Sequence, residues 1–200
     1  MASAVLDHQS YGLSWLMAEP MARASHALAA EGRVWLVDPV DDPAALAAAA
    51  ALGEPAGVLQ LLDRHNRDCA AIATRLGAPH LVNPQALPGT PFELVPVIRW
   101  PGWKETALWW PAEGALVVPE AVGTAPAYAI GPGPVGVHAL IRLVPPGALR
   151  RFAPGHLLVG HGPPVHGPEA TTGLNDALSR SRRDIPRLAL RLPTLLRSAR

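Results

Sequence analysis

Short apolar strands alternate with helices in the first half of this sequence, and this alternation constrains the fold most strongly. The segments 33–37 (RVWLV) and 56–62 (AGVLQLL) are short and largely apolar, as strands buried on both faces of a parallel sheet are. An alanine-rich helix is predicted over 44–51, a second helix over 67–76 and a third strand from 80 to 82. The pattern predicts βαβ units, and sheets of that kind bind ligands at the carboxyl ends of their strands.

The second half of the chain has a different pattern. Pro and Gly punctuate three short apolar segments, which predicts antiparallel strands at Leu94–Trp100, Ala107–Trp110 and Ala115–Val118. The segment 137–144 fits a strand and a helix equally well. A strand over 156–160 and a helix over 169–183 complete the expected elements.

Composition limits the chemistry that the chain can carry. Hydrophobic residues make up 49% of the 200 residues and charged residues 16%, which excludes a disordered chain. Cys69 is the single cysteine, so an internal disulfide framework and zinc sites built from several thiolates are excluded. Eight histidines leave a histidine and carboxylate metal site open.

Charge and hydropathy bear on location and partners. The net charge is +1, so nucleic acid is not an expected partner. Neither a signal peptide nor a membrane-spanning segment is recognisable, and we expect a cytoplasmic protein without a membrane partner. We expect one domain over residues 1–183, followed by a basic C-terminal tail over 184–200.

Polar residues follow the predicted strands in a distinctive order. Asp38 follows the first predicted strand, and the segment D-R-H-N-R-D-C (63–69) follows the second. Trp103 follows a turn, Glu120 follows the strand ALVVP, and His161 follows the strand LLVG. This order resembles the metallo-β-lactamase fold superfamily, in which an H-x-H-x-D-H loop, a G-H turn, an Asp and a late His build two adjacent metal sites. The resemblance implies an α/β fold, specifically a four-layer αββα sandwich.

Several metal ligands of the family pattern are replaced in this sequence. Laid on that pattern, Arg64, Asn66 and Cys69 take the positions of the three loop histidines, and Trp103 falls near the histidine of the turn. His65 falls at a spacer position, so we expect its side chain to point away from the cavity. An arginine side chain stays protonated and cannot ligate a metal, so the resemblance implies that the first metal site is lost.

Two interpretations of the remaining site stay open. Four residues at second-site positions can bind Zn²⁺ or Fe²⁺, namely Asp68, Cys69, Glu120 and His161. Alternatively, Arg64 supplies the positive charge that the metal would provide, paired with Asp68 and Glu120, and Trp103 fills the vacated volume. The predicted pocket comprises Arg64, Asn66, Asp68, Cys69, Trp103, Glu120 and His161.

These interpretations lead to three functional hypotheses. The favoured one is a degenerate member of the fold that holds no cofactor and binds a small molecule or a protein without hydrolysing it. The alternative is a hydrolase of esters, thioesters or similar bonds with one zinc or iron ion at the second site. A weaker third is a metal-free thiol enzyme using Cys69. The other histidines are expected at the surface or in the core, without a ligand role: His8, His26, His80, His138, His156 and His166.

Overall fold

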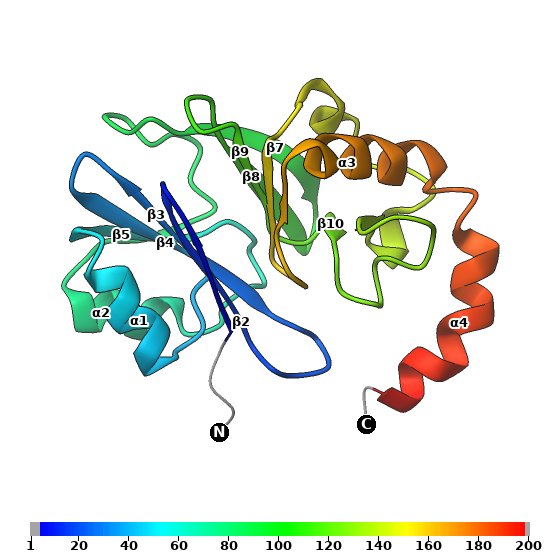
Figure 1. Ribbon diagram of the computed structural model, residues 1–200, viewed down its shortest axis with the longest axis horizontal. Helices are drawn as coiled ribbons and strands as arrows, with labels where there is room; N and C mark the ends of the chain where they lie inside the picture. The colour runs from blue at the N-terminus through cyan, green and yellow to red at the C-terminus, as the bar shows by residue number, and fades with distance from the viewer. Residues whose placement is uncertain (1–4, 199–200) are drawn as a thin grey trace.

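Two β-sheets pack face to face and carry helices on their outer faces (Figure 1). The computed structural model describes residues 5–198, with side chains up to residue 191. The first sheet has the strand order β1-β2-β3-β4-β5-β6, with β1 Val5–Gln9, β2 Gly12–Leu16, β3 Ala24–Ala30, β4 Arg33–Val37, β5 Glu54–Gln60 and β6 His80–Val82. The second has the order β13-β12-β9-β8-β7, with β7 Glu93–Trp100, β8 Trp103–Trp110, β9 Ala115–Val118, β12 His156–Val159 and β13 Val165–His166.

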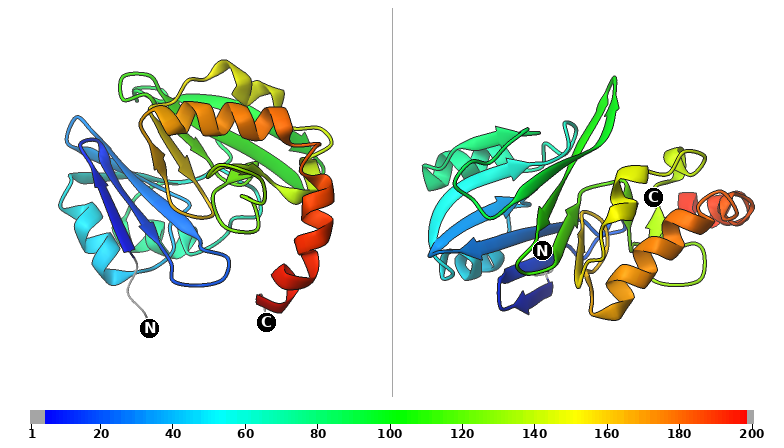
Figure 2. Two further views of the ribbon diagram at one scale, coloured as in Figure 1. Left: turned by 45° about the vertical axis from the view of Figure 1, so that its right-hand side comes forward. Right: turned by 90° about the horizontal axis from the view of Figure 1, so that it is seen from above.

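Helices cover both sheets, as the two further views show (Figure 2). The helices α1 (Pro43–Ala50) and α2 (Cys69–Leu76) pack on the first sheet, and α3 (Pro168–Arg180) packs on the second. The helix α4 (Ile185–Ser198) extends beyond α3 at the edge of the molecule (Figure 1). Short elements complete the chain: β10 Val122–Gly123, β11 Gly136–Val137, η1 Ala139–Ile141 and η2 Gly147–Arg151. The α/β class and the four-layer sandwich expected from the sequence are therefore confirmed.

Local sequence explains where the first helices begin and end. The carboxylate of Asp42 accepts a hydrogen bond from the backbone amide of Ala45 at 2.9 Å, and Pro43 occupies the first turn of α1. The helix α2 ends at Gly77, which adopts a left-handed conformation with φ 62°. These boundaries fall close to those predicted from the sequence.

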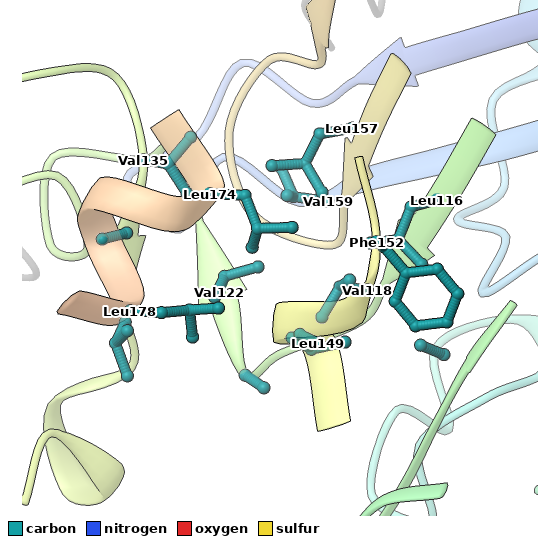
Figure 3. Packing of buried hydrophobic residues seen from close by; sticks show 14 of the residues in the cluster. Leu116, Val118, Val122, Val135, Leu149, Phe152, Leu157, Val159, Leu174 and Leu178 are labelled. Carbon is teal, nitrogen blue, oxygen red and sulfur yellow. The ribbon is translucent and has the colours of Figure 1, made fainter. Parts of the chain in front are cut away.

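Alternating side chains of the central strands enter two different cores. On β9, Val117 packs between the two sheets, whereas Leu116 and Val118 point toward α3. Leu174 and Leu178 of α3 close this second core from outside (Figure 3). Strands buried on both faces read as continuous apolar runs, which is why ALVV was recognisable in the sequence.

Three features differ from the sequence predictions. An antiparallel arrangement of β1, β2 and β3 precedes the first predicted strand. The segment 137–144, open between strand and helix, forms the end of β11 and the short 3₁₀ turn η1. The basic tail, for which no helix was predicted, forms α4 and continues through Pro193. Residues 1–4 of the predicted domain and 199–200 of the predicted tail lie outside the described residues.

No helix in the described part of the chain is both long and apolar enough to cross a membrane.

Candidate functional site

The candidate site lies where the carboxyl ends of paired strands from the two sheets meet. The strands β4 and β5 run parallel, and so do β9 and β12, so each pair ends at one edge of its sheet. The residues that follow these four strands are Asp38, the loop 61–68, Glu120 and His161. This is the edge at which the βαβ pattern predicted a ligand site.

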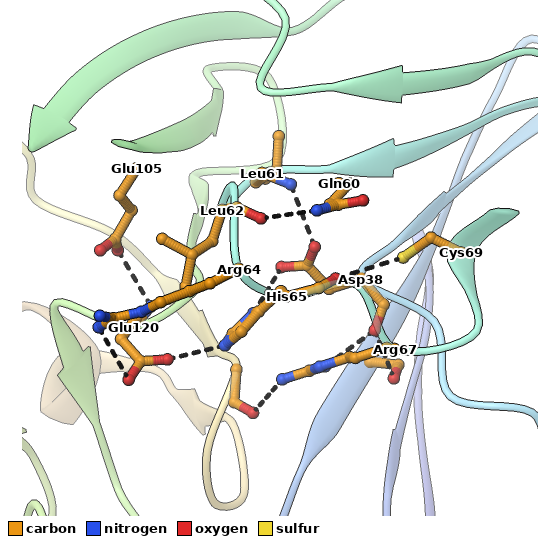
Figure 4. A network of polar contacts seen from close by, with 12 residues as sticks. Asp38, Gln60, Leu61, Leu62, Arg64, His65, Arg67, Cys69, Glu105 and Glu120 are labelled. Atoms are coloured by element: carbon orange, nitrogen blue, oxygen red, sulfur yellow. Dashed lines mark hydrogen bonds and ion pairs between the residues drawn. The ribbon is translucent and has the colours of Figure 1, made fainter. Parts of the chain in front are cut away.

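Three side chains converge here with their ligand atoms within 4.8 Å of one another: His65, Glu120 and His161. Nε2 of His65 lies 2.7 Å from Oε2 of Glu120, and Nε2 of His161 lies 3.4 Å from the same oxygen. The three side chains are 9%, 12% and 6% exposed, respectively. The group is therefore a nearly buried set of two imidazoles and one carboxylate. Figure 4 shows the contact between His65 and Glu120.

The other ring nitrogens fix how these imidazoles are presented. Nδ1 of His161 lies 2.9 Å from the backbone carbonyl of Met21, to which it donates. Nδ1 of His65 lies 3.2 Å from the carboxylate of Asp38 and donates there. In its neutral form each ring therefore turns an unprotonated Nε2 toward Glu120, so that three electron-pair donors face one another. Such an arrangement requires a cation between them, either a proton or a metal ion.

A third histidine plays a different part. The backbone amide of Leu140 donates to Nδ1 of His138 at 3.2 Å, which places the ring proton on Nε2. That Nε2 lies 3.3 Å from Oε1 of Glu120 and donates to it. His138 therefore binds the oxygen of Glu120 that faces away from the other two histidines, as a hydrogen-bond donor.

Two arginines from the loop after β5 surround the group with positive charge. The guanidinium of Arg64 lies 3.6 Å from Oε1 of Glu120 and 4.0 Å above the ring of Trp103. Arg67 donates to three backbone carbonyls, at Ala24, Asp38 and Gly160, over 2.6, 2.8 and 2.9 Å. Arg67 therefore ties β3, β4 and the loop after β12 together.

The backbone around the group is closely fitted. Asp38 and Arg67 have positive φ angles of 43° and 40°, which cost free energy for residues other than glycine. A Cβ atom on Gly160 would lie 2.0 Å from the carbonyl oxygen of Pro119 and 3.2 Å from the ring of His65. Glycine is therefore required at position 160 for the end of β12 to approach β9.

A fully buried carboxylate, that of Glu105, fixes the backbone at Glu120 through hydrogen bonds. Glu105 accepts hydrogen bonds from the backbone amides of Glu120 and Ala121 at 3.0 and 2.8 Å, and from the indole of Trp103 at 3.0 Å. Burial raises the pKa of Glu105 although these hydrogen bonds oppose it. Glu105 therefore positions both Glu120 and Trp103.

The pKa shifts follow from these contacts. Burial acts to raise the pKa of Glu120, but hydrogen bonds from His138, His161 and His65 outweigh it and hold the pKa well below its usual range. Burial acts to lower the pKa of His65, but its hydrogen bonds to Asp38 and Glu120 prevail and raise it. The group therefore favours an ionised carboxylate next to a cation.

The structure brings together four of the residues singled out in the sequence, namely Arg64, Trp103, Glu120 and His161. The other three lie outside the group. The carboxylate of Asp68 accepts from the backbone amide of Asp41 at 2.8 Å, and exposed Asn66 accepts from Gln60 at 3.3 Å.

Cys69 is also outside the group, because α2 begins there and turns its side chain into the core between that helix and the first sheet. Burial raises the pKa of the Cys69 thiol to about 12. A thiol with such a pKa is protonated near neutral pH and does not suit the proposed thiol enzyme.

The orientation predicted for His65 is wrong, and its side chain points into the site. The chain turns directly after β5, with the amide of His65 bonded to the carbonyl of Leu62 at 3.0 Å, so Arg64 and His65 both reach Glu120. His138, expected without a ligand role, also contacts Glu120. Its loop position carries no sequence signal for this contact.

Comparisons with known proteins bear on the fold. No family model and no curated protein matches the sequence. A metallo-β-lactamase from Erythrobacter litoralis with β-mercaptoethanol in its active site superposes with a TM-score of 0.60 at 10% identity, covering 90% of this chain and 98% of that one. The metallo-β-lactamase FIM-1 from Pseudomonas aeruginosa in its mono-zinc form gives 0.57 at 10% identity, covering 90% and 96%.

A third similar structure is a peroxy diiron species of the chemotaxis sensor ODP, with a TM-score of 0.57 at 11% identity and coverage of 90% and 98%. Each similarity extends over nearly the whole of both chains. The chain therefore has the metallo-β-lactamase fold, as the resemblance in its sequence predicted.

Proposed function

We propose that this protein is a hydrolase with a single Zn²⁺ or Fe²⁺ ion held by His65, Glu120 and His161, and that it acts on an ester, a thioester or a similar bond. One observation carries the proposal: two imidazole nitrogens and a carboxylate oxygen converge within 4.8 Å. Zinc and iron sites in the mono-zinc and diiron structures of similar fold are consistent with it.

The donor set fits a catalytic metal. Two histidines and one glutamate are a known ligand set of catalytic zinc, and two histidines with one carboxylate also bind non-haem iron. Metal-binding histidines usually donate their second nitrogen to a carboxylate or a backbone carbonyl. Asp38 and the carbonyl of Met21 accept those hydrogen bonds here.

The same neighbourhood limits the site to one ion. Arg64 lies within 3.6 Å of Glu120, and Arg67 is fixed by three carbonyls close enough for its charge to lower the pKa of His65. Neither guanidinium can ligate a metal, and both repel a second divalent cation.

When bound, such an ion supplies Lewis acidity, which acidifies a water molecule and polarises a carbonyl. The residues of the chain supply the rest. Asp38 and Met21 orient the two imidazoles, and His138 donates a hydrogen bond to Glu120. Arg64 is 39% exposed and available to an anionic substrate group.

A second candidate function keeps the hypothesis favoured from the sequence. In a metal-free binding protein, the cation among the donors is a proton on His65, which lies between Asp38 and Glu120. The contact of Arg64 with Glu120 and its position over Trp103 favour this candidate, because they place a permanent positive charge in the pocket.

Metal content separates the two candidates. The full chain is produced with zinc or iron supplied and without chelators, as the wild type and as His161→Ala, with His8→Ala as a control at an exposed histidine. We expect about one metal ion per wild-type and His8→Ala chain, and loss of metal together with p-nitrophenyl acetate hydrolysis in His161→Ala. Trace metal in all three proteins would reject the metal hydrolase and favour the binding protein.

A further inference from the structure

Acidic and basic side chains are separated along this chain, although its net charge is only +1. Residues 1–120 carry seven basic and 13 acidic side chains, whereas residues 121–200 carry ten arginines and three acidic side chains. Within the described residues, the arginines of this second part lie in or beside η1, η2, α3 and α4. Figure 1 shows α3 and α4 on the opposite side of the molecule from α1 and α2. The protein therefore has one strongly basic side, and such charge asymmetry indicates an anionic partner.

Exposed apolar side chains gather on this basic side. Eight large apolar side chains are exposed in the described part of the chain, and three of them lie within five residues, in η1 and directly after it. These are Leu140, Leu143 and Val144, which are 74%, 65% and 65% exposed. Trp100 at the end of β7 is 46% exposed and lines the same surface depression as Val144. These four side chains form an apolar patch of the kind that marks an interaction surface.

Arginines of α3 and η2 lie directly beside the apolar patch. The guanidinium of Arg182, which follows α3, donates to the backbone carbonyl of Leu143 at 2.7 Å. Arg150 of η2 donates to the carbonyl of Leu178 near the end of α3 at 3.0 Å. The segment that carries the patch is therefore held against the end of α3, with cationic side chains next to it.

The positive charge at this surface is not neutralised by neighbouring carboxylates. Arg151 and Arg183 are exposed and form neither a hydrogen bond nor an ion pair with any other residue that the structure describes. Asp184, the acidic residue beside Arg183 in the sequence, has a side chain that is only 2% exposed. Its carboxylate is already paired within the protein, with Arg142, Arg180 and Arg187. The exposed guanidinium groups are therefore available to an external anion.

We infer that this surface binds to a membrane that contains anionic lipids. The exposed leucine, valine and tryptophan side chains enter the boundary between the headgroups and the acyl chains, where tryptophan is commonly found. The surrounding arginines bind the lipid phosphates. The absence of a recognisable membrane-spanning segment led us to expect no membrane partner, but surface binding requires no such segment. The inference does not depend on the proposed hydrolysis.

Two other occupants fit the surface less well. Nucleic acid would satisfy the arginines, but its interfaces with proteins are polar, and it would leave the apolar patch unexplained. A second copy of the chain, related by a two-fold axis through this surface, would place arginines opposite arginines. An anionic lipid surface accounts for the charge and for the exposed apolar side chains together.

Sedimentation with lipid vesicles tests the inference on the full chain. The vesicles contain either phosphatidylcholine alone or phosphatidylcholine mixed with an equal amount of phosphatidylglycerol. We expect the protein to sediment with the mixed vesicles in a buffer of low ionic strength and to remain in solution with phosphatidylcholine alone. Raising the ionic strength is expected to weaken the binding, because salt screens the attraction between the arginines and the lipids.

One pair of double variants tests the contribution of charge. Arg151→Gln combined with Arg183→Gln removes two exposed charges beside the apolar patch. Arg33→Gln combined with Arg75→Gln is the matched control, because it removes two exposed charges from the acidic part of the chain. The first double variant is expected to bind the mixed vesicles about 30-fold more weakly than the wild type, whereas the control retains its affinity.

A second pair of double variants tests the contribution of the apolar patch. Leu143→Ser combined with Val144→Ser is expected to weaken binding to the mixed vesicles about tenfold, because less apolar surface leaves water. Val5→Ser combined with Val82→Ser is the control, since these side chains are 63% and 52% exposed outside the patch. The control is expected to bind as the wild type does.

Three results would overturn the inference. The first is sedimentation that is equal with both kinds of vesicle, or absent with both at low ionic strength. The second is binding to a DNA duplex that the arginine variant loses and the patch variant keeps, without vesicle binding, which would assign the surface to nucleic acid. The third is self-association without vesicle binding, abolished in the patch variant, which would assign the surface to a second copy of the chain.

Discussion

Acidification is expected to destabilise this protein through His26, a residue of β3 that lies beneath the candidate site. His26 is 1% exposed, accepts a hydrogen bond from the hydroxyl of Ser14 at 2.7 Å on Nδ1, and donates to the carbonyl of Val159 at 3.2 Å from Nε2. Both ring nitrogens are therefore satisfied in the neutral form. Burial, together with the charge of Arg67, lowers the pKa of His26 from 6.5 to about 4, although the hydrogen bond to Val159 and the charges of Asp38 and Asp7 oppose the shift.

The size of the effect follows from this pKa. Between pH 6.5 and 4 the unfolded chain binds a proton at this position and the folded chain does not, so stability falls as the pH falls. His26 alone is expected to remove about 2 kcal/mol from the free energy of unfolding at pH 5 and about 3 kcal/mol at pH 4, relative to pH 8.

Urea unfolding followed by tryptophan fluorescence at pH 8 and pH 5 measures this loss. His26→Gln keeps a polar side chain without an ionisable ring, and His8→Gln is the control on exposed β1. At pH 8 His26→Gln is expected to be less stable than the wild type. Between pH 8 and pH 5 its free energy of unfolding is expected to fall by about 2 kcal/mol less than that of the wild type. Equal losses in the wild type and His26→Gln would refute the reasoning.

Three further predictions concern the residues around the site. Asp38→Asn is expected to weaken zinc affinity about 10- to 100-fold, because it alters the hydrogen bond that orients His65. Asp41→Asn is the control and is expected to leave the affinity unchanged. Competition with a chromophoric chelator measures both affinities, and equal values would contradict the role of Asp38 in orienting His65. Arg67→Met is expected to lower the free energy of unfolding by about 3 kcal/mol, because three carbonyls lose their donor. Arg75→Met, at an exposed ion pair, is the control and is expected to change this free energy little. Similar losses for both variants in urea unfolding would contradict the role of Arg67 in joining these segments. Cys69, with its pKa raised to about 12, is expected to react with iodoacetamide only after unfolding, and fast labelling of the native protein by mass spectrometry would contradict its burial.

Much of the fold was predictable because its central strands are buried on both faces. Segments such as RVWLV and ALVVP read as apolar runs, and Gly77 marks the end of α2. The strands β1 to β3 were not predicted, because their polar and small residues, such as Ser14 and Ser25, become buried only through hydrogen bonds to distant groups. Long-range contacts of that kind leave no periodic signal in the sequence.

The place of the candidate site was predictable, but the residues that build it were only partly so. The loop after β5, Glu120 and His161 follow from strand ends and from the family pattern. The inward orientation of His65 depends on a turn one residue after the strand, and the contact of His138 with Glu120 depends on a loop closed by tertiary packing. When the sequence is aligned with the family pattern without a structure, nothing in the sequence reveals that such a loop is misaligned by one residue.

A crystal structure of the protein grown with zinc, with anomalous diffraction collected at the zinc edge, tests the central claim most directly. We expect one anomalous peak about 2.0–2.2 Å from Nε2 of His65, Nε2 of His161 and an oxygen of Glu120. We also expect Asp38 and the carbonyl of Met21 to keep their hydrogen bonds to the two rings. A fully occupied zinc ion elsewhere, with none among these three residues, would contradict the account.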